Sequence, residues 1–215
     1  DRQLTETKLA GITTEKLEYD YAGNVRSKTD GEGNKTLYAY DEMDRLVDVS
    51  VLKGETVTKL ATYTYNAEGN VITKNAGENN IIHYTYTASD SIKEIITGED
   101  KDVFFYNSDG LLEKSTDPNG NITTYTYTPQ GLVSKEETKN SDDETIIREY
   151  TYDKNGNVLK SVVTENGKKN YIYREYDELS RVTKKEATDS VTCEYIYDYI
   201  TEGNLVCDIL RYDNG

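Results

Sequence analysis

The chain repeats one short phrase along almost its whole length. Residues 150–158 read Y-T-Y-D-K-N-G-N-V, residues 63–71 read Y-T-Y-N-A-E-G-N-V, and residues 125–133 read Y-T-Y-T-P-Q-G-L-V. Repeats with a period of about 22 residues constrain the fold strongly, because each copy must be one small structural unit that packs against its neighbours. The last tyrosines of the phrases, called the anchor tyrosines below, are Tyr19, Tyr40, Tyr65, Tyr86, Tyr106, Tyr127, Tyr152, Tyr176 and Tyr197.

Each anchor tyrosine is followed by the residue pattern of a tight turn. A short oxygen-bearing side chain at the first position can accept a hydrogen bond from a turn amide, and glycine three positions later suits the left-handed conformation of a G1 bulge. The first positions are Asp20, Asp41, Asn66, Thr87, Asn107, Thr128, Asp153, Asp177 and Asp198. The positions three residues later are Gly23, Asp44, Gly69, Asp90, Gly110, Gly131, Gly156 and Ser180.

A second turn falls about ten residues after each anchored turn, most clearly at Asp117-Pro118-Asn119-Gly120. Two turns per unit leave two strands of about five to seven residues, and the two-residue spacing of the tyrosines places their rings on one face of a sheet. The extra residues of the longer repeats fall around 53–55 and 140–143, in the second class of turn. We therefore predict an all-β, antiparallel array of β-hairpins with about 18 strands, curved or spiralling.

Composition and hydropathy narrow the possible partners. The formal charge of -15 argues against nucleic acid and anionic membranes, whose binding needs clustered Lys and Arg. No stretch of about 18 apolar residues could span a membrane, and residues 1–7 lack a signal-peptide pattern. Leu, Ile, Val and Phe form only about a fifth of the chain, but 20 tyrosines supply the apolar surface of an ordered protein.

The repeated phrase and its connector resemble the RHS/YD-repeat family. The resemblance covers the chain from about residue 17 to residue 215, and we expect residues 1–215 to be a single array of about nine repeats excised from a longer protein. The segments that carry it are Y-T-Y-D-K-N-G-N at 150–157, T-D-P-N-G-N at 116–121, T-T-Y-T-Y at 123–127, Y-A-Y-D-E-M-D-R-L at 38–46 and Y-D-E-L-S-R-V at 176–182.

The resemblance implies a strip of hairpins that forms part of a hollow β-shell in a large secreted or cell-surface bacterial protein. In the toxins of this family the shell encloses a C-terminal cytotoxic segment; for this chain the implied partners are flanking repeats and an enclosed C-terminal segment of the parent protein. Surface members act in adhesion, which implies glycans or surface proteins as alternative partners. The family's self-cleaving core segment is not matched, because the only Asp-Pro pair is Asp117-Pro118 within a connector, so neither self-cleavage nor a toxin payload is implied.

The residues themselves give little support to catalysis or to a cofactor. His83 is the only histidine and precedes a strand-like Tyr-Thr-Tyr, so we interpret it as structural and expect no enzyme activity. The D-K-N-G-N phrase at 153–157 fails the spacing of an EF-hand loop, which needs glycine at position 6 and glutamate at position 12. We predict no metal and no cofactor.

Two groups of residues fall outside the repeat positions. Tyrosines at repeat positions are most simply packing residues, so a sugar-stacking surface would use off-pattern aromatic residues, and the candidates are Phe104, Phe105, Tyr171 and Tyr199. Cys193 and Cys207 could bridge adjacent strands or remain free thiols; we favour free thiols.

Overall fold

The structure is a computed structural model whose described part is made only of β-strands, turns and irregular connections. The described residues are 4–9, 12–77, 80–188, 192–199 and 205–212, and the side chains at 4, 5, 8, 9, 12, 13, 192, 193, 195–199 and 205–212 are not described. Within this part no helix is long and apolar enough to cross a membrane. The predicted all-β class is confirmed.

Two compact units make up the chain, residues 1–102 and residues 103–215. The strands that start in the first unit are β1 (Leu4–Leu9), β2 (Ile12–Tyr19), β3 (Val25–Asp30), β4 (Lys35–Tyr40), β5 (Leu46–Lys53), β6 (Thr56–Tyr65), β7 (Val71–Asn75), β8 (Ile81–Tyr86), β9 (Ile92–Thr97) and β10 (Asp100–Tyr106). Those of the second unit are β11 (Leu112–Thr116), β12 (Ile122–Tyr127), β13 (Val133–Lys139), β14 (Thr145–Tyr152), β15 (Val158–Glu165), β16 (Lys168–Tyr176), β17 (Val182–Ala187), β18 (Thr192–Tyr199) and β19 (Leu205–Tyr212).

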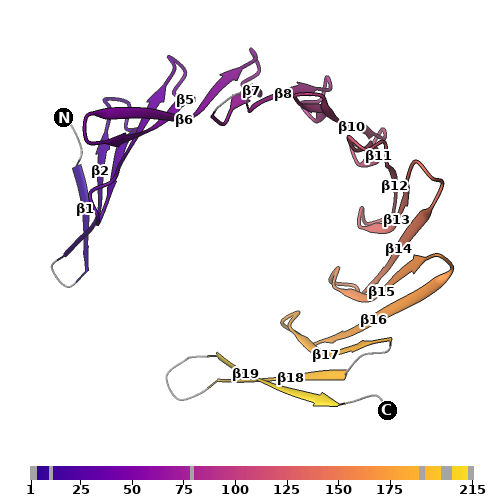
Figure 1. Ribbon diagram of the computed structural model, residues 1–215. Helices are drawn as coiled ribbons and strands as arrows, with labels where there is room; N and C mark the ends of the chain where they lie inside the picture. The colour runs from indigo at the N-terminus through magenta and orange to yellow at the C-terminus, as the bar shows by residue number, and fades with distance from the viewer. Residues whose placement is uncertain (1–3, 10–11, 78–79, 189–191, 200–204, 213–215) are drawn as a thin grey trace. The chain divides into compact units, whose positions relative to one another are not determined.

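The topology is a succession of hairpins. In the first unit each strand from β1 to β9 pairs antiparallel with the next strand in sequence. In the second unit the same holds from β10 to β19, and Figure 1 lets the reader follow the hairpins in order. The predicted antiparallel hairpin array is confirmed, and that all residues form one array stays a prediction.

The alternation of side chains along the strands explains why these sequences form a sheet. In β12, Thr123, Tyr125 and Tyr127 are half-buried, whereas the intervening side chains are exposed. The same alternation occurs in β8, where Tyr84 and Tyr86 are half-buried. Aromatic residues thus share one face, as expected for a period of two residues.

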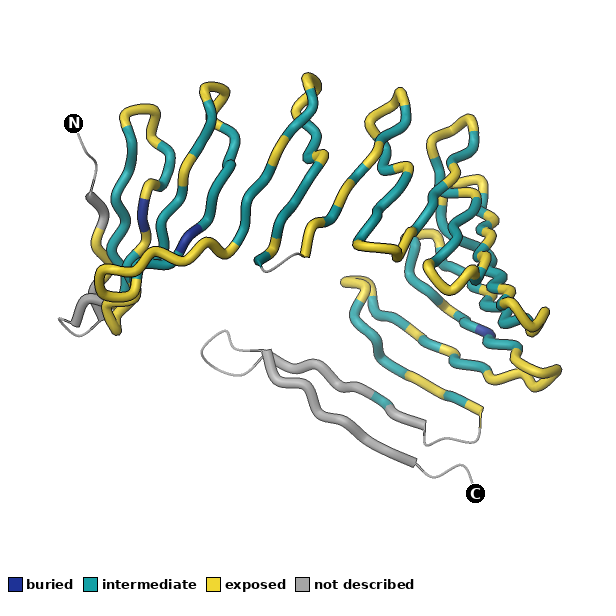
Figure 2. Tube along the Cα trace, turned by 45° about the horizontal axis from the view of Figure 1, so that its top comes forward, coloured by how far each residue is buried: buried dark blue, intermediate teal, exposed yellow. Residues whose placement is uncertain are grey.

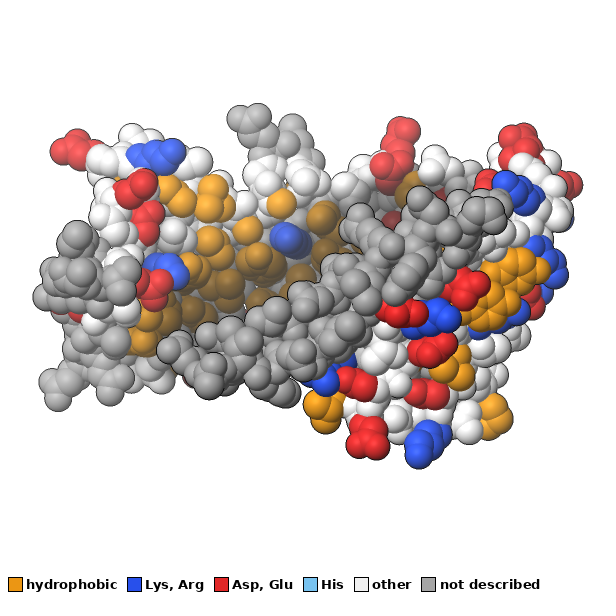
Figure 3. All heavy atoms as spheres, turned by 90° about the horizontal axis from the view of Figure 1, so that it is seen from below, with side chains coloured by type: hydrophobic (Ala, Val, Ile, Leu, Met, Phe, Trp, Pro, Cys, Tyr) orange, Lys and Arg blue, Asp and Glu red, His pale blue; other side chains and the backbone are white. Residues whose placement is uncertain are grey.

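The core of this sheet is thin. Among the described apolar side chains only Val162 is buried, with an exposed fraction of 8%. The other two buried residues are polar, Ser27 and Ser50, and the Ser27 hydroxyl donates to Glu18 Oε2 at 2.9 Å. Exposed residues concentrate at the turns (Figure 2), and Figure 3 shows hydrophobic side chains gathered in a recessed area of the surface beside areas of charged side chains. Stability must therefore come from half-buried side chains and from hydrogen bonds between neighbouring strands.

One feature differs from the expectation for the longer repeats. The turn at Gly54 is tight, because Lys53 pairs directly with Thr56, and the extra residues lengthen β6 to ten residues. At 140–143 the loop remains a turn of the same type as the connector at Asp117, so the additional residues again lengthen the flanking strands β13 and β14.

Candidate functional site: the anchored turns

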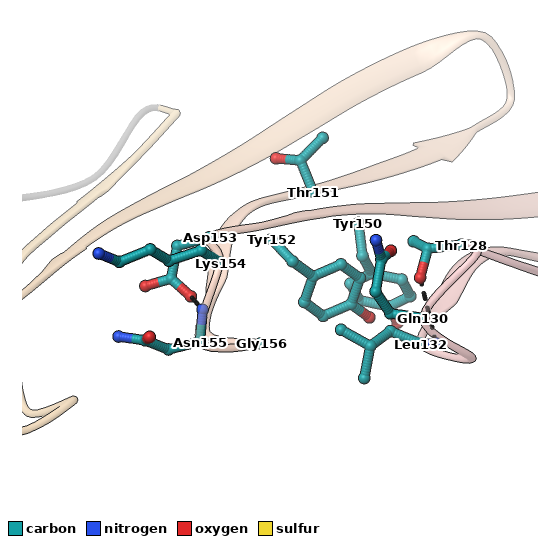
Figure 4. A pocket seen from close by; sticks show the side chains of 10 residues that line it. All are labelled: Thr128, Gln130, Leu132, Tyr150, Thr151, Tyr152, Asp153, Lys154, Asn155 and Gly156. Atoms are coloured by element: carbon teal, nitrogen blue, oxygen red, sulfur yellow. Dashed lines mark hydrogen bonds between the residues drawn. The ribbon is translucent and has the colours of Figure 1, made fainter.

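The turn that follows each anchor tyrosine is held by a dense set of hydrogen bonds. At Asp153 the backbone N–H donates to the Asn157 carbonyl at 2.9 Å, and the Gly156 N–H donates to the Asp153 carbonyl at 3.2 Å. The Asp153 carboxylate accepts from the amides of Asn155 and Asn157, both at 2.8 Å. Figure 4 shows the first of these bonds. The aspartate side chain thereby takes over backbone donors that a turn would otherwise leave to water.

Gly156 adopts the left-handed conformation, with φ of +86°. The bond from the Asp153 N–H to the Asn157 carbonyl and the bond from the Gly156 N–H to the Asp153 carbonyl place Gly156 and Asn157 opposite Asp153, which is the geometry of a G1 bulge. A type I turn with this bulge allows the two strands to keep their right-handed twist. The same pair of backbone bonds closes the turns that begin at Asp20, Asp41, Asn66, Thr87, Asn107, Thr128 and Asp177.

The hydroxyl groups of the anchor tyrosines join each hairpin to the one before it. In the second unit the Tyr152 hydroxyl donates to the carbonyl of Val133 at 2.6 Å, and the Tyr176 hydroxyl donates to that of Val158 at 2.9 Å. The remaining bonds of this kind are Tyr40 to Val25 at 3.0 Å, Tyr65 to Leu46 at 2.6 Å, Tyr86 to Val71 at 2.8 Å and Tyr127 to Leu112 at 2.7 Å. We call them phenol bridges.

A phenol bridge lies where the pairing between consecutive hairpins has stopped. The last paired residues of β15 and β16 towards the anchored turns are Lys160 and Tyr173, so Val158 lies beyond the ladder. Its carbonyl would lack a strand partner on that side, and the Tyr176 hydroxyl supplies the donor. Each bridge therefore connects neighbouring hairpins where main-chain hydrogen bonds do not.

The environment of the bridges changes the acidity of the groups involved. Partial burial is the main cause that raises the pKa of the hydroxyl groups of Tyr40, Tyr65, Tyr86, Tyr127 and Tyr152. For Asp153 the side-chain amide of Asn157 and then the turn amides lower the carboxyl pKa. Near neutral pH the raised pKa keeps these tyrosine hydroxyl groups protonated and able to donate. The lowered pKa keeps the Asp153 carboxylate ionised and able to accept.

A notch lies between two consecutive anchored turns of the second unit (Figure 4). Its volume is about 770 Å³, and its lining includes Gln130, Leu132, Tyr150 and Tyr152. In Figure 4 these four side chains point toward one another, whereas Lys154 and Asn155 point away from them. Because the Tyr152 hydroxyl is already engaged with Val133, the notch offers a shallow, mixed polar and apolar surface without a free buried donor from that tyrosine.

The off-pattern aromatic residues singled out for sugar stacking do not form one cluster. Phe104 and Phe105 are neighbours on β10, so they point to opposite faces of the sheet, and Phe105 is 47% exposed with Lys114 Nζ at 5.4 Å from its ring centre. Tyr171 lies on β16. The side chain of Tyr199, like those of Tyr197 and Asp198, falls outside the described residues.

Tyr171 belongs to a small aromatic cluster that sequence reasoning did not find. Its ring stacks on Tyr173 with 6.2 Å between centres and 10° between planes. Lys160 Nζ lies 4.9 Å from the Tyr171 ring and 5.2 Å from the Tyr173 ring. The two-residue spacing of the tyrosines was the available signal, and Lys160 is placed opposite Tyr173 by strand register. We call Lys160, Tyr171 and Tyr173 the tyrosine pair site.

Other candidate groups stay apart in the structure. His83 is exposed on β8. Over the described part of the chain, no three His, Cys, Asp or Glu side chains are grouped so that they could hold a metal ion. The side chains of Cys193 and Cys207 lie outside the described residues, so the choice between free thiols and a bridge stays open.

Comparison with known proteins supports the repeat assignment. The family model described as RHS Repeat matches residues 19–56 and 106–145. No curated protein matches the sequence. The crystal structure of TcdB2-TccC3-Cdc42 is similar over 93% of this chain and 12% of that chain, with a TM-score of 0.71 and 16% identity. The structure of TcdB2-TccC3 without its hypervariable C-terminal region is similar over 86% of this chain and 12% of that chain, with a TM-score of 0.57 and 11% identity.

The chain spans about one eighth of the length of these solved chains, and at such low identity the similarity shows the fold alone. The sequence match agrees with the structure, because both matched segments begin at an anchor tyrosine, Tyr19 or Tyr106, and each contains two anchored turns. Two segments of the chain match the RHS repeat, and the resemblance to the RHS/YD-repeat family is confirmed.

Proposed function

We propose that the chain is a non-catalytic structural module that forms part of the β-shell wall of a large secreted or cell-surface bacterial RHS/YD-repeat protein. Its partners are then the flanking repeats and an enclosed C-terminal segment of the parent protein. The observation that carries the proposal is the set of six phenol bridges, which uses the most regularly repeated side chain of the sequence to join one hairpin to the next.

The anchored turns support the same function, because their repeated residues are engaged in building the turn. Asp153, for instance, accepts from two backbone amides and from the side-chain amide of Asn157. Most of the acceptor capacity of such a carboxylate is used within the turn. We therefore assign the repeat positions structural roles, and we propose that they hold no metal and no cofactor.

The proposal is tested in the parent protein by limited proteolysis. If this segment is part of an enclosing wall, Gly156→Val, which strains an anchored turn, should expose the enclosed segment to protease at a concentration that leaves it intact in the wild type. Thr151→Ser, on an exposed side chain of the same hairpin, is the matched control and should leave it protected. Equal sensitivity of the segment in the wild-type and Gly156→Val proteins would contradict a wall function.

The tyrosine pair site favours a second candidate, an adhesion module that binds a glycan or a surface protein. Tyr173 is 45% exposed and parallel to Tyr171, so the pair presents an aromatic edge next to a cation. Saturable binding of the chain to a defined sugar on a glycan array, lost in Tyr173→Ala but kept in Phe105→Ala, would favour adhesion. Absence of such binding at millimolar sugar concentrations would leave the wall function alone.

A further inference from the structure

Three anchored turns carry a residue other than glycine at the left-handed position. Asp44, Asp90 and Ser180 have φ values of +60°, +58° and +60°. The Cβ atom makes this conformation unfavourable for L-residues, and glycine avoids the cost. These three exceptions therefore need a compensating interaction at each site.

The same compensating interaction occurs at all three sites. Asn24 Nδ2 donates to Asp44 Oδ1 at 2.8 Å, and Asn70 Nδ2 donates to Asp90 Oδ1 at 2.8 Å. Asn157 Nδ2 donates to the Ser180 hydroxyl at 3.0 Å. In each case the asparagine is the residue after the left-handed position of the preceding anchored turn. Consecutive turns are thus linked side chain to side chain.

Among the eight described anchored turns, the other junctions within each unit lack the asparagine. Arg45, Leu111 and Leu132 occupy its position, and the left-handed residues of the turns that follow are Gly69, Gly131 and Gly156. Leu132 Cδ1 lies 3.7 Å from the place that a Cβ on Gly156 would occupy. Arg45 instead donates from Nη1 to the backbone carbonyl of Asn66 at 3.2 Å, a contact that needs no side chain on Gly69.

The two kinds of junction follow from simple chemistry. The side-chain amide of asparagine is a donor that a carboxylate or hydroxyl acceptor on the next turn can meet, whereas leucine offers no donor. Without a donor, Asp or Ser at the left-handed position would bring backbone strain and no compensating bond, and glycine is then the better residue.

We propose a pairing rule between adjacent repeats: asparagine after one anchored turn specifies Asp or Ser at the left-handed position of the next, and any other residue there specifies glycine. The rule rests on the proposed structural function and deepens it, because it names the neighbour that each repeat accepts. The partner of each anchored turn is a second repeat whose left-handed residue matches the donor.

The first test is a double-mutant cycle at Asn70 and Asp90, read by hydrogen exchange of the amides of Thr87, Asp90 and Ser91. Asn70→Ala should lower their protection about fivefold in the wild-type background and should have no effect on the turn in the Asp90→Gly background. The Asn70 backbone bond to Asn66 Oδ1 is kept in every variant. Equal loss in both backgrounds would overturn the rule. A gain in protection from Asp90→Gly alone would overturn it too, because relief of strain would then outweigh the bond.

The second test moves the pair to a junction that lacks it. Gly131→Asp should lower the protection of the amides of Thr128 and Leu132, and adding Leu111→Asn should restore most of it. A double variant whose loss equals the product of the two single losses would overturn the rule. Both tests use the chain alone, so their failure would leave the proteolysis test of the wall function unaffected, and a failure of that test would leave the pairing rule standing.

Discussion

The turns at the two ends of the hairpins differ in how regular their geometry is. At the anchored end, all eight described turns have the same five-residue geometry, closed by the same two backbone bonds. At the opposite end the connectors vary: Asp30, Asp117 and Asn140 begin turns of that type, whereas Gly54 and Gly167 lie in tight two-residue loops. We infer that turn geometry is restricted at the end where a backbone carbonyl must accept a hydrogen bond from the anchor tyrosine of the next hairpin. At the opposite end the type and length of the turn can vary.

The largest expected effect comes from lengthening a turn at each end. Inserting Gly-Ser after Lys154 would separate Asp153 from its turn amides and move Val158 away from Tyr176, with an expected cost of about 2 kcal/mol from several lost hydrogen bonds. The same insertion after Gly54, in a two-residue connector that does not begin with a capping Asp or Asn side chain, should cost only about 0.6 kcal/mol. Urea unfolding followed by circular dichroism measures both, and equal costs would remove the distinction between the two ends.

Strain at the left-handed position should give the next largest effect. Gly156→Val places a β-branched side chain at φ of +86°, and we expect a loss of about 1–2 kcal/mol or more. Gly156→Asn is the matched control, because asparagine tolerates this conformation better. Urea midpoints compare the variants, and a Val variant as stable as the wild type would contradict the bulge geometry.

Removing one phenol bridge should have a moderate effect. Tyr152→Phe keeps the ring but leaves the Val133 carbonyl without its donor, so we expect a loss of about 1 kcal/mol. Tyr173→Phe, at a hydroxyl on a 45% exposed residue, should change the free energy of unfolding by less than about 0.5 kcal/mol. If the two variants lose the same stability, the bridges do not hold the anchored edge.

The smallest effect per residue should appear as a dependence on alkaline pH. The raised pKa of Tyr40, Tyr65, Tyr86, Tyr127 and Tyr152 means that their stabilising effect is complete below about pH 10, the pKa of an unfolded tyrosine, and is lost as pH rises through the folded pKa. Urea midpoints between pH 9 and 11 should therefore fall, and Tyr152→Phe should fall less steeply. A midpoint independent of pH over this range would show that the phenols titrate alike in both states.

The parts of the fold that depend on neighbouring residues were predictable. The Tyr-x-Tyr spacing and the Asp153-to-Gly156 pattern indicate strand faces and turns because side-chain alternation and turn hydrogen bonds act within a few residues. The phenol bridges were not predicted, since their acceptors are backbone carbonyls, which carry no sequence signature. The Asn24–Asp44 bond joins residues 20 positions apart, and only strand register brings them together.

The tyrosine pair site was also not predictable from the sequence, because it depends on how two strands pair. Tyr171 was singled out as off-pattern, but its stacking on Tyr173 and the position of Lys160 depend on cross-strand pairing of β15 with β16. The extra residues near Gly54 lengthened β5 and β6 because Lys53 and Thr56 pair, an outcome decided by the register of both strands together.

The direction of the phenol bridges has a consequence for how such a chain can grow. Each of the six bridges runs from a tyrosine to a carbonyl in the hairpin just before it, so one repeat contains both a donor for its predecessor and an acceptor for its successor. A tandem duplication of one unit in the gene therefore adds a tyrosine and a matching carbonyl at once. As far as the phenol bridges are concerned, the array can be lengthened or shortened by whole units without changing the units that remain.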